Sequence, residues 1–270
     1  MRDPIAAGQV VLVTGASAGI GEAIAMELAR RGVRLALAAR GAAELERVAA
    51  ACRALGAEAS AFPTDVSVEE ECRAFVEGAA STFGRVDALV NNAGISMWAR
   101  FEEIRDLAIV ERIMRVNFLG SVWCTAAALP HLRRTRGRLV AVASLTALSG
   151  VPTRTAYAAS KHAMRGFFDS LRIELAGSGV SVTVAYPGFV RTSVASRALG
   201  ADGRPVIDRH VQEARAMSAE RCAGLVLRAA DGREREVVMT ARGRMGRWLK
   251  LIAPDLVDRM AARAIERGVT

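Results

Sequence analysis

The feature that most limits the folds open to this chain is an alternation of short apolar runs with longer segments of helical periodicity. The runs are apolar on both faces, and they occupy residues 10–15, 34–40, 88–94, 138–144, 180–188 and 235–240. Segments with the periodicity of amphipathic helices separate them, at 19–31, 42–55, 101–133 and 218–230. Strands buried on both sides are typical of a parallel sheet covered by helices. We therefore predict a three-layer, doubly wound α/β fold, with a mainly parallel seven-stranded sheet and helices on both faces.

The chain is predicted to form one unit and not two. Its 270 residues suffice for one large α/β domain, and no linker rich in Pro, Gly or Ser interrupts the alternation. We assign residues 1–240 to a single dinucleotide-binding and catalytic domain and residues 241–270 to a C-terminal amphipathic extension of it. Residues 191–214 break the pattern just after a strand, which favours a substrate lid over a tolerated surface insertion.

Charge and composition exclude several classes of protein. The net charge is +9, but only 5% of the residues are aromatic and no basic run is interleaved with stacking rings, so we expect no nucleic-acid partner. No uninterrupted apolar stretch reaches 18 residues, and the N-terminus lacks the apolar core of a secretory signal, so we expect a cytoplasmic protein. The four cysteines and three histidines are dispersed, which argues against a disulfide framework and against a metal site.

A glycine-rich segment lies between the first apolar run and the first helical segment. Gly15, Gly19 and Gly21 are spaced through "VTGASAGIGEA". Without Cβ atoms in the way, a pyrophosphate can approach backbone N–H groups at a helix N-terminus, where the helix dipole favours anions. The context, after a strand and before a helix, indicates a dinucleotide site of the Rossmann type.

The end of the second apolar run distinguishes the two dinucleotides. A site for NAD usually carries an acidic residue there for the ribose 2′-hydroxyl, whereas this chain has Arg40, and the next acidic residue is Glu44 inside a helical segment. Arg40 suits the 2′-phosphate of NADP, with Ser17 in the glycine-rich segment as a second donor. We predict NADP(H) as the preferred cofactor.

Tyr157 and Lys161 stand four residues apart in "YAASK", in a chain with two tyrosines and only one other lysine. On a helix this spacing places both side chains on one face. A neighbouring ammonium favours the phenolate, which brings a phenol with an ordinary pKa of about 10 closer to proton transfer at neutral pH. Hydride addition to a carbonyl requires a proton, and because a zinc ligand set is missing, Tyr157 is the candidate donor.

Motifs in a characteristic order resemble the short-chain dehydrogenase/reductase family over nearly the whole chain. They are "TGASAGIG" at 14–21, similar to its cofactor loop, "NNAG" at 91–94, "VN" ending at 117, "VASLTALSG" beginning at 142, "YAASK" at 157–161, and "YPGFVRT" at 186–192, similar to its nicotinamide-side motif.

The resemblance implies four catalytic residues. Ser144 would hydrogen-bond the reacting oxygen and Tyr157 would be the general acid/base. Lys161 would lower the pKa of that tyrosine and hold the nicotinamide ribose. Asn117 would anchor a water that relays protons.

The resemblance also implies the residues that hold the cofactor, with Asp65 facing the adenine. The full set is Gly15, Ser17, Ala18, Gly19, Ile20, Gly21, Arg40, Asp65, Val66, Asn92, Ala93, Gly94, Tyr157, Lys161, Pro187, Gly188, Val190 and Thr192. One departure concerns Ala18, because NADP-using members often carry Arg or Lys just before the second loop glycine. The 2′-phosphate would then rest mainly on Arg40, which leaves NAD(H) open as a second cofactor.

The substrate is expected to be a small, fairly hydrophobic carbonyl or alcohol. Apolar residues close to the predicted reacting centre support this expectation. The predicted substrate contacts are Ser144, Tyr157, Met97, Trp98, Leu145 and Val151.

The C-terminal segment has a basic, Trp-bearing start and then an apolar helical face. Packing on a neighbouring subunit or over the substrate pocket is favoured, and peripheral contact with an anionic membrane is the alternative. The family resemblance implies a homodimer or homotetramer, built through helices at 101–133 and 155–176.

The leading functional prediction is an NADP(H)-dependent oxidoreductase that interconverts a secondary alcohol and a ketone or aldehyde. A narrower alternative is a reductase of 3-oxoacyl thioesters, in which the basic surface would meet an acidic carrier protein. An alternative of another class is a non-catalytic NADP-binding sensor or scaffold.

Overall fold

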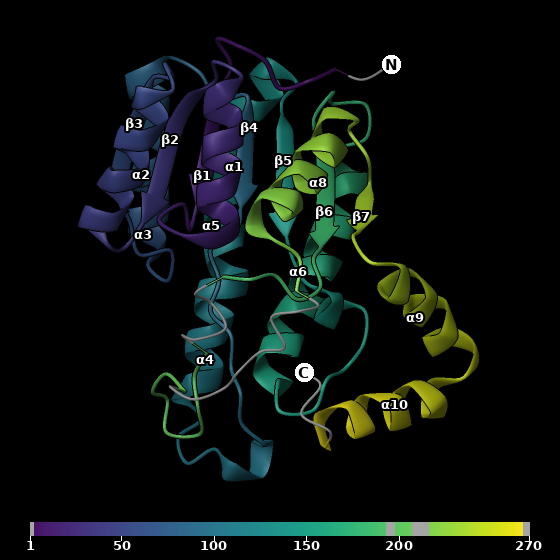
Figure 1. Cartoon of the computed structure of the whole chain (residues 1–270). Helices are drawn as coiled ribbons and strands as arrows, with labels where there is room; N and C mark the ends of the chain where they lie inside the picture. Colours follow the sequence, from purple (N-terminus) through teal and green to yellow (C-terminus); the bar gives the residue numbers. More distant parts are fainter. Residues whose placement is uncertain (1–2, 193–197, 207–215, 267–270) are drawn as a thin grey trace.

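The structure is a computed structural model that describes residues 3–192, 198–206 and 216–266 (Figure 1). Seven strands form one sheet in the order β3-β2-β1-β4-β5-β6-β7, and every neighbouring pair runs parallel. They are β1 Val10–Thr14, β2 Arg34–Ala39, β3 Ala59–Pro63, β4 Ala88–Asn91, β5 Arg138–Val142, β6 Ser181–Tyr186 and β7 Glu236–Val238. The predicted α/β fold with a seven-stranded sheet is confirmed.

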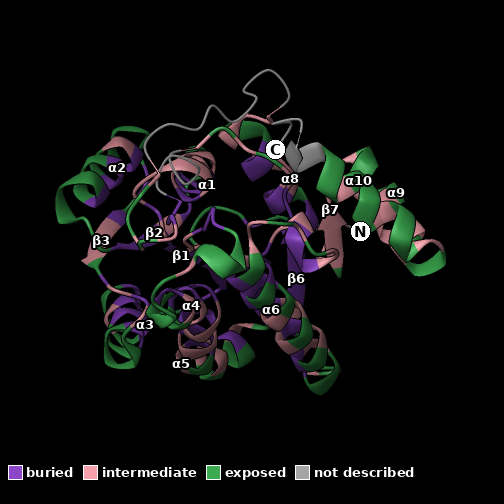
Figure 2. Ribbon diagram, turned by 90° about the horizontal axis from the view of Figure 1, so that it is seen from below, coloured by how far each residue is buried: buried purple, intermediate pink, exposed green. Residues whose placement is uncertain are grey.

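Three long helices cover each face of the sheet (Figure 2). On one face lie α1 Gly19–Arg30, α2 Ala42–Ala54 and α8 Ala219–Asp231; on the other lie α3 Glu69–Phe83, α5 Gly120–Thr135 and α6 Thr155–Glu174. Val11 and Val13 of β1 pack on the first layer, and Val10 and Leu12 pack on the second. Each fully buried Val or Leu side chain contributes about 1.5–3 kcal/mol of transfer free energy, so both faces of these strands must be apolar.

The seventh strand, β3, was not among the apolar runs identified in the sequence. It lies at the edge of the sheet and pairs only with β2, and its residues from Ser60 to Phe62 are half-buried. It ends at Pro63, which has no backbone N–H. An edge strand tolerates this residue because its outer side has no neighbouring strand to bond.

The segment 101–133, predicted as one long helical stretch, is divided in the structure. A 3₁₀ turn, η1 Phe101–Glu103, comes first; α4 Ala108–Met114 follows, then a π-helical turn, η2 Arg115–Leu119, and then α5. Just after this turn the helix passes close to the segment that follows β3: a Cβ on Gly120 would lie 2.5 Å from the carbonyl oxygen of Val66. Such π turns occur frequently at functional sites, and this one carries Asn117.

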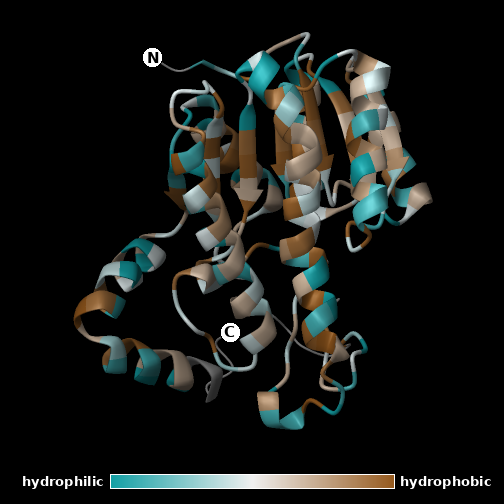
Figure 3. Cartoon of the chain, turned by 180° about the vertical axis from the view of Figure 1, so that it is seen from behind, coloured by the Kyte–Doolittle hydropathy of each residue, from teal (hydrophilic) through white to brown (hydrophobic). Residues whose placement is uncertain are grey.

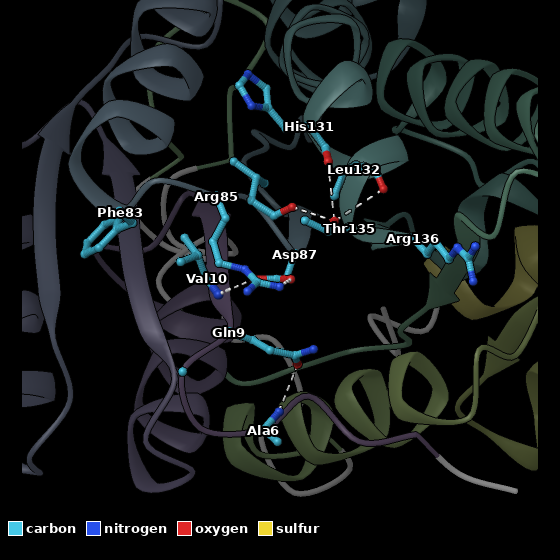
Figure 4. Close-up of polar contacts among 12 residues, drawn as sticks. Ala6, Gln9, Val10, Phe83, Arg85, Asp87, His131, Leu132, Thr135 and Arg136 are labelled. Atoms are coloured by element: carbon cyan, nitrogen blue, oxygen red, sulfur yellow. Dashed lines mark hydrogen bonds and ion pairs between the residues drawn. The ribbon is translucent and has the colours of Figure 1, made fainter.

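The amino ends of β1 and β4 are joined by Asp87 (Figure 4). One carboxylate oxygen, Oδ2, accepts from the N–H of Val10 at 2.8 Å, and Arg85 donates to the two oxygens at 2.8 and 2.7 Å. Thr135, at the end of α5, donates from Oγ1 to the carbonyl oxygen of Val86 at 2.8 Å. These contacts fix the edge of the sheet opposite to the one where the predicted site residues gather.

After β7 the chain leaves the sheet and forms α9 Ala241–Ile252 and α10 Pro254–Glu266 (Figure 1). Arg244 anchors α9 by donating from Nη1 to the carbonyl oxygen of Val238 at 3.1 Å, and Arg247 pairs with Glu236. Both helices mix polar and apolar residues (Figure 3), and large apolar side chains stay exposed on them: Met245, Trp248, Leu251, Ile252, Leu256 and Met260. In the part of the chain that the structure describes, no helix is long and apolar enough to cross a bilayer.

Candidate active site

The predicted site residues follow the carboxyl ends of the central strands. The strand order reverses between β1 and β4, and in open α/β sheets ligands bind at such a switch point, outside the carboxyl ends. The segments after β1, β4, β5 and β6 meet there, so residues far apart in sequence share one edge of the sheet.

The loop between β1 and α1 packs closely on itself and on the segment after β4, and its glycines make this packing possible. Gly15 has a φ of +66°, and a Cβ on it would lie 2.8 Å from the Cα of Ala93. A Cβ on Gly21 would lie 2.2 Å from the carbonyl oxygen of Gly15. Asn92 donates from Nδ2 to the carbonyl oxygens of Thr14 and Gly15, at 3.0 and 3.2 Å. The N-terminus of α1 thus follows a tightly packed glycine-rich loop, a setting that fits a pyrophosphate.

The end of β2 carries a cation available to a ligand. Arg40 is exposed and takes part in none of the ion pairs within the described residues. It faces Asp65, whose pKa burial alone would raise; hydrogen bonds from Ser67 and the charges of Arg40 and Arg112 together hold that pKa below its ordinary value. Asp65 therefore stays ionised at neutral pH.

A second arginine near the glycine loop went unnoticed in the sequence. Arg47 of α2 donates to the carbonyl oxygen of Ser17 at 3.5 Å and pairs with Glu22 of α1 at 2.9 Å. Because this pairing offsets the negative charge of Glu22 in the first turn of α1, the helix N-terminus keeps its preference for anions.

Asn117 is completely buried and links three segments of the site. Its Oδ1 accepts from the N–H of Ile95 at 2.8 Å, and its Nδ2 donates to the carbonyl oxygen of Ile95 at 2.9 Å and to Oγ of Ser160 at 2.9 Å. Ser160 donates in turn to the carbonyl oxygen of Tyr157 at 2.8 Å. The π turn, the segment after β4 and α6 are therefore held in one arrangement.

Tyr157 and Lys161 lie one turn apart on α6, with Nζ of the lysine 5.9 Å from the centroid of the phenol ring. Lys161 is buried and donates from Nζ to the carbonyl oxygen of Val142 at 3.0 Å. Burial lowers its pKa to about 8. Burial raises the pKa of Tyr157, against the opposing effects of a hydrogen bond with Ser144 and the charge of Arg154. Tyr157 is therefore a neutral proton donor at neutral pH, with Ser144 beside it.

The charge that acts on Tyr157 in this structure is that of Arg154, a residue that sequence reasoning overlooked. The expected lowering of the pKa of Tyr157 by Lys161 stays a prediction for the cofactor-bound enzyme. Nothing in the sequence marks Arg154, which stands just before α6 as its N-cap residue.

The predicted substrate contacts take different positions. Met97 is fully buried in a cluster with Ile109, Ile113, Ala156 and Leu199, and Trp98 is nearly buried. Leu145 and Val151 are half-buried near Ser144. Leu145 donates from its N–H to the carbonyl oxygen of Pro187 at 2.9 Å, which joins the serine loop to the segment after β6.

The predicted lid, 191–214, is described in part. Leu199 accepts from the N–H of Trp98 at 2.7 Å and donates to the carbonyl oxygen of Ser96 at 2.9 Å, so this part pairs with the segment after β4. Thr192 lies against Gly19, on which a Cβ would be 3.0 Å from the Cβ of Thr192. Residues 193–197 and 207–214 of the predicted lid lie outside the described residues.

Comparisons with known proteins show which proteins this chain resembles. The family model for short chain dehydrogenase matches residues 9–201. The 11-beta-hydroxysteroid dehydrogenase-like 4A of Arabidopsis thaliana is 41% identical over 251 residues, which is 93% of this chain and 82% of that protein.

Two solved structures are similar over most of their length. An alcohol dehydrogenase from the archaeon Thermococcus sibiricus, complexed with 5-hydroxy-NADP, is 30% identical with a TM-score of 0.73, covering 85% of this chain and 94% of that one. A short chain dehydrogenase/reductase from Burkholderia phymatum, in complex with NAD, is 27% identical with a TM-score of 0.82, covering 93% of this chain and 95% of that one.

Proposed function

This chain belongs to the short-chain dehydrogenase/reductase family, and from that premise we propose that it interconverts a secondary alcohol and a ketone or aldehyde with NADP(H) as the preferred cofactor. Family membership makes the chain an oxidoreductase that acts on CH–OH groups. The observation that carries the proposal is the meeting of Ser144, Tyr157 and Lys161, with Gly94 of the segment after β4 close to the lysine.

The residues of this chain supply the proton that the reaction needs and determine when it is transferred. When bound, the nicotinamide nucleotide supplies a hydride to the carbonyl carbon or accepts one from the alcohol. In the reduction, Ser144 donates a hydrogen bond to the carbonyl oxygen and Tyr157 gives that oxygen its phenolic proton. In the oxidation, the tyrosine takes the proton back, and this direction needs the phenolate. The raised pKa of Tyr157 means that the tyrosine holds its proton at neutral pH, which is the form that the reduction uses.

Lys161 and Asn117 are assigned to support proton transfer by Tyr157. We assign Lys161 to the nicotinamide ribose and to stabilising the phenolate after proton transfer. Its ammonium is already buried and held by the carbonyl oxygen of Val142, so little reorientation is needed. Asn117 fixes the segment after β4 against α6 and is assigned to anchoring the water that returns a proton to Tyr157.

The preference for NADP(H) rests on Arg40. Arg40 is exposed and forms no ion pair within the described residues, although its charge acts on Asp65, and such a guanidinium suits a phosphate. No acidic residue ends β2 to accept from a ribose hydroxyl. The relatives are divided on this point, since one of the two solved structures holds an NADP derivative and the other holds NAD.

Three further assignments accompany the function. We assign residues 1–240 to one catalytic domain that acts in the cytoplasm as a homodimer or homotetramer. We assign the exposed apolar side chains of α9 and α10 to contact with a second subunit in preference to a membrane surface.

The experiment that tests the proposed function is a panel of ketones, aldehydes and secondary alcohols followed through the absorbance of NADPH. Turnover of a carbonyl with NADPH is the expected result. A protein that binds NADPH tightly and turns over no member of the panel would instead be the sensor or scaffold of the alternative reading.

A further inference from the structure

Arg154 lies where three segments of the site converge. The side chain comes from the residue just before α6 and is close to three aromatic rings. Its Cζ is 4.4 Å from the ring centroid of Trp98, 5.9 Å from that of Tyr157 and 5.7 Å from that of Phe189. Trp98 follows β4, Tyr157 is the assigned proton donor and Phe189 follows β6, so this cation stands beside the reacting position.

The guanidinium has far more donors than partners. It has five N–H groups, and the structure gives it one hydrogen bond, from Nη1 to Oγ of Ser96 at 3.2 Å. Its Nε is buried without a hydrogen-bond partner. The guanidinium of Arg154 contacts aromatic rings in place of water, and several of its N–H groups have no partner. Such a group can bind a hydrogen-bond acceptor.

No carboxylate of the protein compensates this charge in the described residues. Burial lowers the pKa of Arg154, and the one group that acts in the opposite direction is the phenol of Tyr157. Two other arginines that are shielded from solvent are paired: buried Arg138 contacts Asp3 at 2.8 Å, and half-buried Arg31 contacts Asp231 at 3.0 Å. A half-buried cation without an ion pair is costly in the free protein, and an anionic ligand relieves that cost.

We propose that Arg154 binds a carboxylate of the substrate, so that the substrate is an oxo acid or hydroxy acid with an otherwise apolar body. The inference rests on the proposed alcohol/ketone chemistry and names the substrate class within it. A carboxylate matches the planar fork of a guanidinium, which can donate two parallel hydrogen bonds to it. The closeness of Arg154 to Tyr157 places the carboxylate within a few bonds of the reacting carbonyl, and the rings of Trp98 and Phe189 beside the guanidinium suit an apolar body.

The test compares acids with their methyl esters, because esterification removes the charge and keeps the carbon skeleton. Suitable probes are 2-oxo-4-phenylbutanoate, 4-oxo-4-phenylbutanoate and 5-oxo-5-phenylpentanoate, each beside its methyl ester. Dissociation constants are measured by calorimetry on the full chain in the presence of NADP⁺, with wild type, Arg154→Gln and Arg154→Lys. Arg134→Gln is the matched control, since it removes the same charge from an exposed position at the far end of α5.

At least one acid should bind the wild type about tenfold to a hundredfold more tightly than its ester. Arg154→Gln should abolish that difference in affinity by weakening the binding of the acid alone. Arg154→Lys should retain part of the difference, and Arg134→Gln should leave it intact. Equal binding of every acid and its ester by the wild type would overturn the proposal. An equal loss of affinity for acid and ester in Arg154→Gln would also overturn it, because Arg154 would then serve only to hold Trp98 against α6.

The readout is binding, so it is independent of turnover. If acids bind in the expected way and no carbonyl is reduced, the proposed function fails and the anion site stands. If neutral ketones are reduced and acids gain nothing from Arg154, the anion site fails and the proposed function stands.

Discussion

Nζ of Lys161 lies 5.9 Å from the ring centroid of Tyr157, yet its hydrogen bond goes to the carbonyl oxygen of Val142 at 3.0 Å. The ammonium and the phenol are thus neighbours without being bonded, and burial acts on both. It lowers the pKa of Lys161 to about 8 and raises that of Tyr157. Each pKa is shifted in the direction that favours the uncharged form of its group. We expect a bound ribose and substrate to favour the charged forms of both groups instead.

Replacing Lys161 with Met should stabilise the cofactor-free protein at neutral pH. Burial lowers the pKa of this lysine from 10.5 to about 8, so holding its proton in the fold costs about 3 kcal/mol below pH 8. Loss of the hydrogen bond to Val142 costs about 1 kcal/mol, which leaves a net gain of about 2 kcal/mol.

The direction in which folding stability changes with pH follows from proton binding to Lys161. Between pH 8 and 10.5 the unfolded chain holds the proton and the folded chain has released it, so the stability of the wild type rises with pH and the advantage of the variant disappears. Urea unfolding of both proteins near neutral pH and near the upper end of that range measures this. Lys250→Met, in α9, should show no such trend, and a gain independent of pH would contradict the burial argument.

Replacing Gly21 with Ala should destroy cofactor binding. The added Cβ would lie 2.2 Å from the carbonyl oxygen of Gly15 and 2.6 Å from Nδ2 of Asn92, so the loop must move. We expect affinity for NADPH to fall about a hundredfold and the free energy of unfolding to fall by about 1–3 kcal/mol. Gly224→Ala, on α8, is the control, because open space surrounds that position and alanine should stabilise the helix by about 0.5–1 kcal/mol. Fluorescence titration with NADPH and urea unfolding provide the two measurements, and normal NADPH affinity in Gly21→Ala would refute the description of the loop.

Asn117→Ala should destabilise the protein more than Asn91→Ala does. Both side chains are buried, but Asn117 makes three hydrogen bonds between separate segments, whereas Asn91 makes one, to Thr125, and leaves its Oδ1 unpaired. We expect a loss of about 2–4 kcal/mol for Asn117→Ala, because the backbone groups of Ile95 would be left unpaired, and a smaller loss for Asn91→Ala. Urea unfolding gives both values, and equal losses would show that the contacts of Asn117 add nothing specific.

Arg40→Asp should reverse the choice of cofactor. The guanidinium at the end of β2 favours the 2′-phosphate, and an aspartate there would accept from the 2′-hydroxyl and repel the phosphate. The dissociation constant of NADPH should rise about tenfold to a hundredfold, while that of NADH should fall. Arg134→Asp makes the same charge change far from the loop and should alter neither value. Tighter binding of NADH than of NADPH by both the wild type and Arg40→Asp would reject the assignment.

The central part of the fold could be predicted because its strands are buried on both faces. Leu35 and Leu37 pack on one helical layer and Ala36 and Ala38 on the other, which leaves a continuous apolar run in the sequence. The edge strand β3 is covered less completely, and its sequence carries a correspondingly weaker pattern.

The parts that escaped prediction depend on tertiary contacts. The π turn at Arg115–Leu119 lies beside the close approach of Gly120 to Val66, and a helical periodicity contains no sign of either feature. Arg154 resembles many surface arginines in the sequence, and only its burial among aromatic rings distinguishes it. The spacing of Tyr157 and Lys161 did predict a shared helical face, but the hydrogen bond of the lysine to Val142 depends on β5.

The most direct measurement of the central claim, that Tyr157 carries the proton, is turnover and NADPH affinity of Tyr157→Phe beside Tyr186→Phe. These are the two tyrosines of the chain, and Tyr186 is buried at the end of β6. The account predicts that Tyr157→Phe lowers kcat about a hundredfold to ten-thousandfold while the dissociation constant of NADPH stays within about twofold, and that Tyr186→Phe retains turnover. Turnover at the wild-type rate by Tyr157→Phe would contradict it.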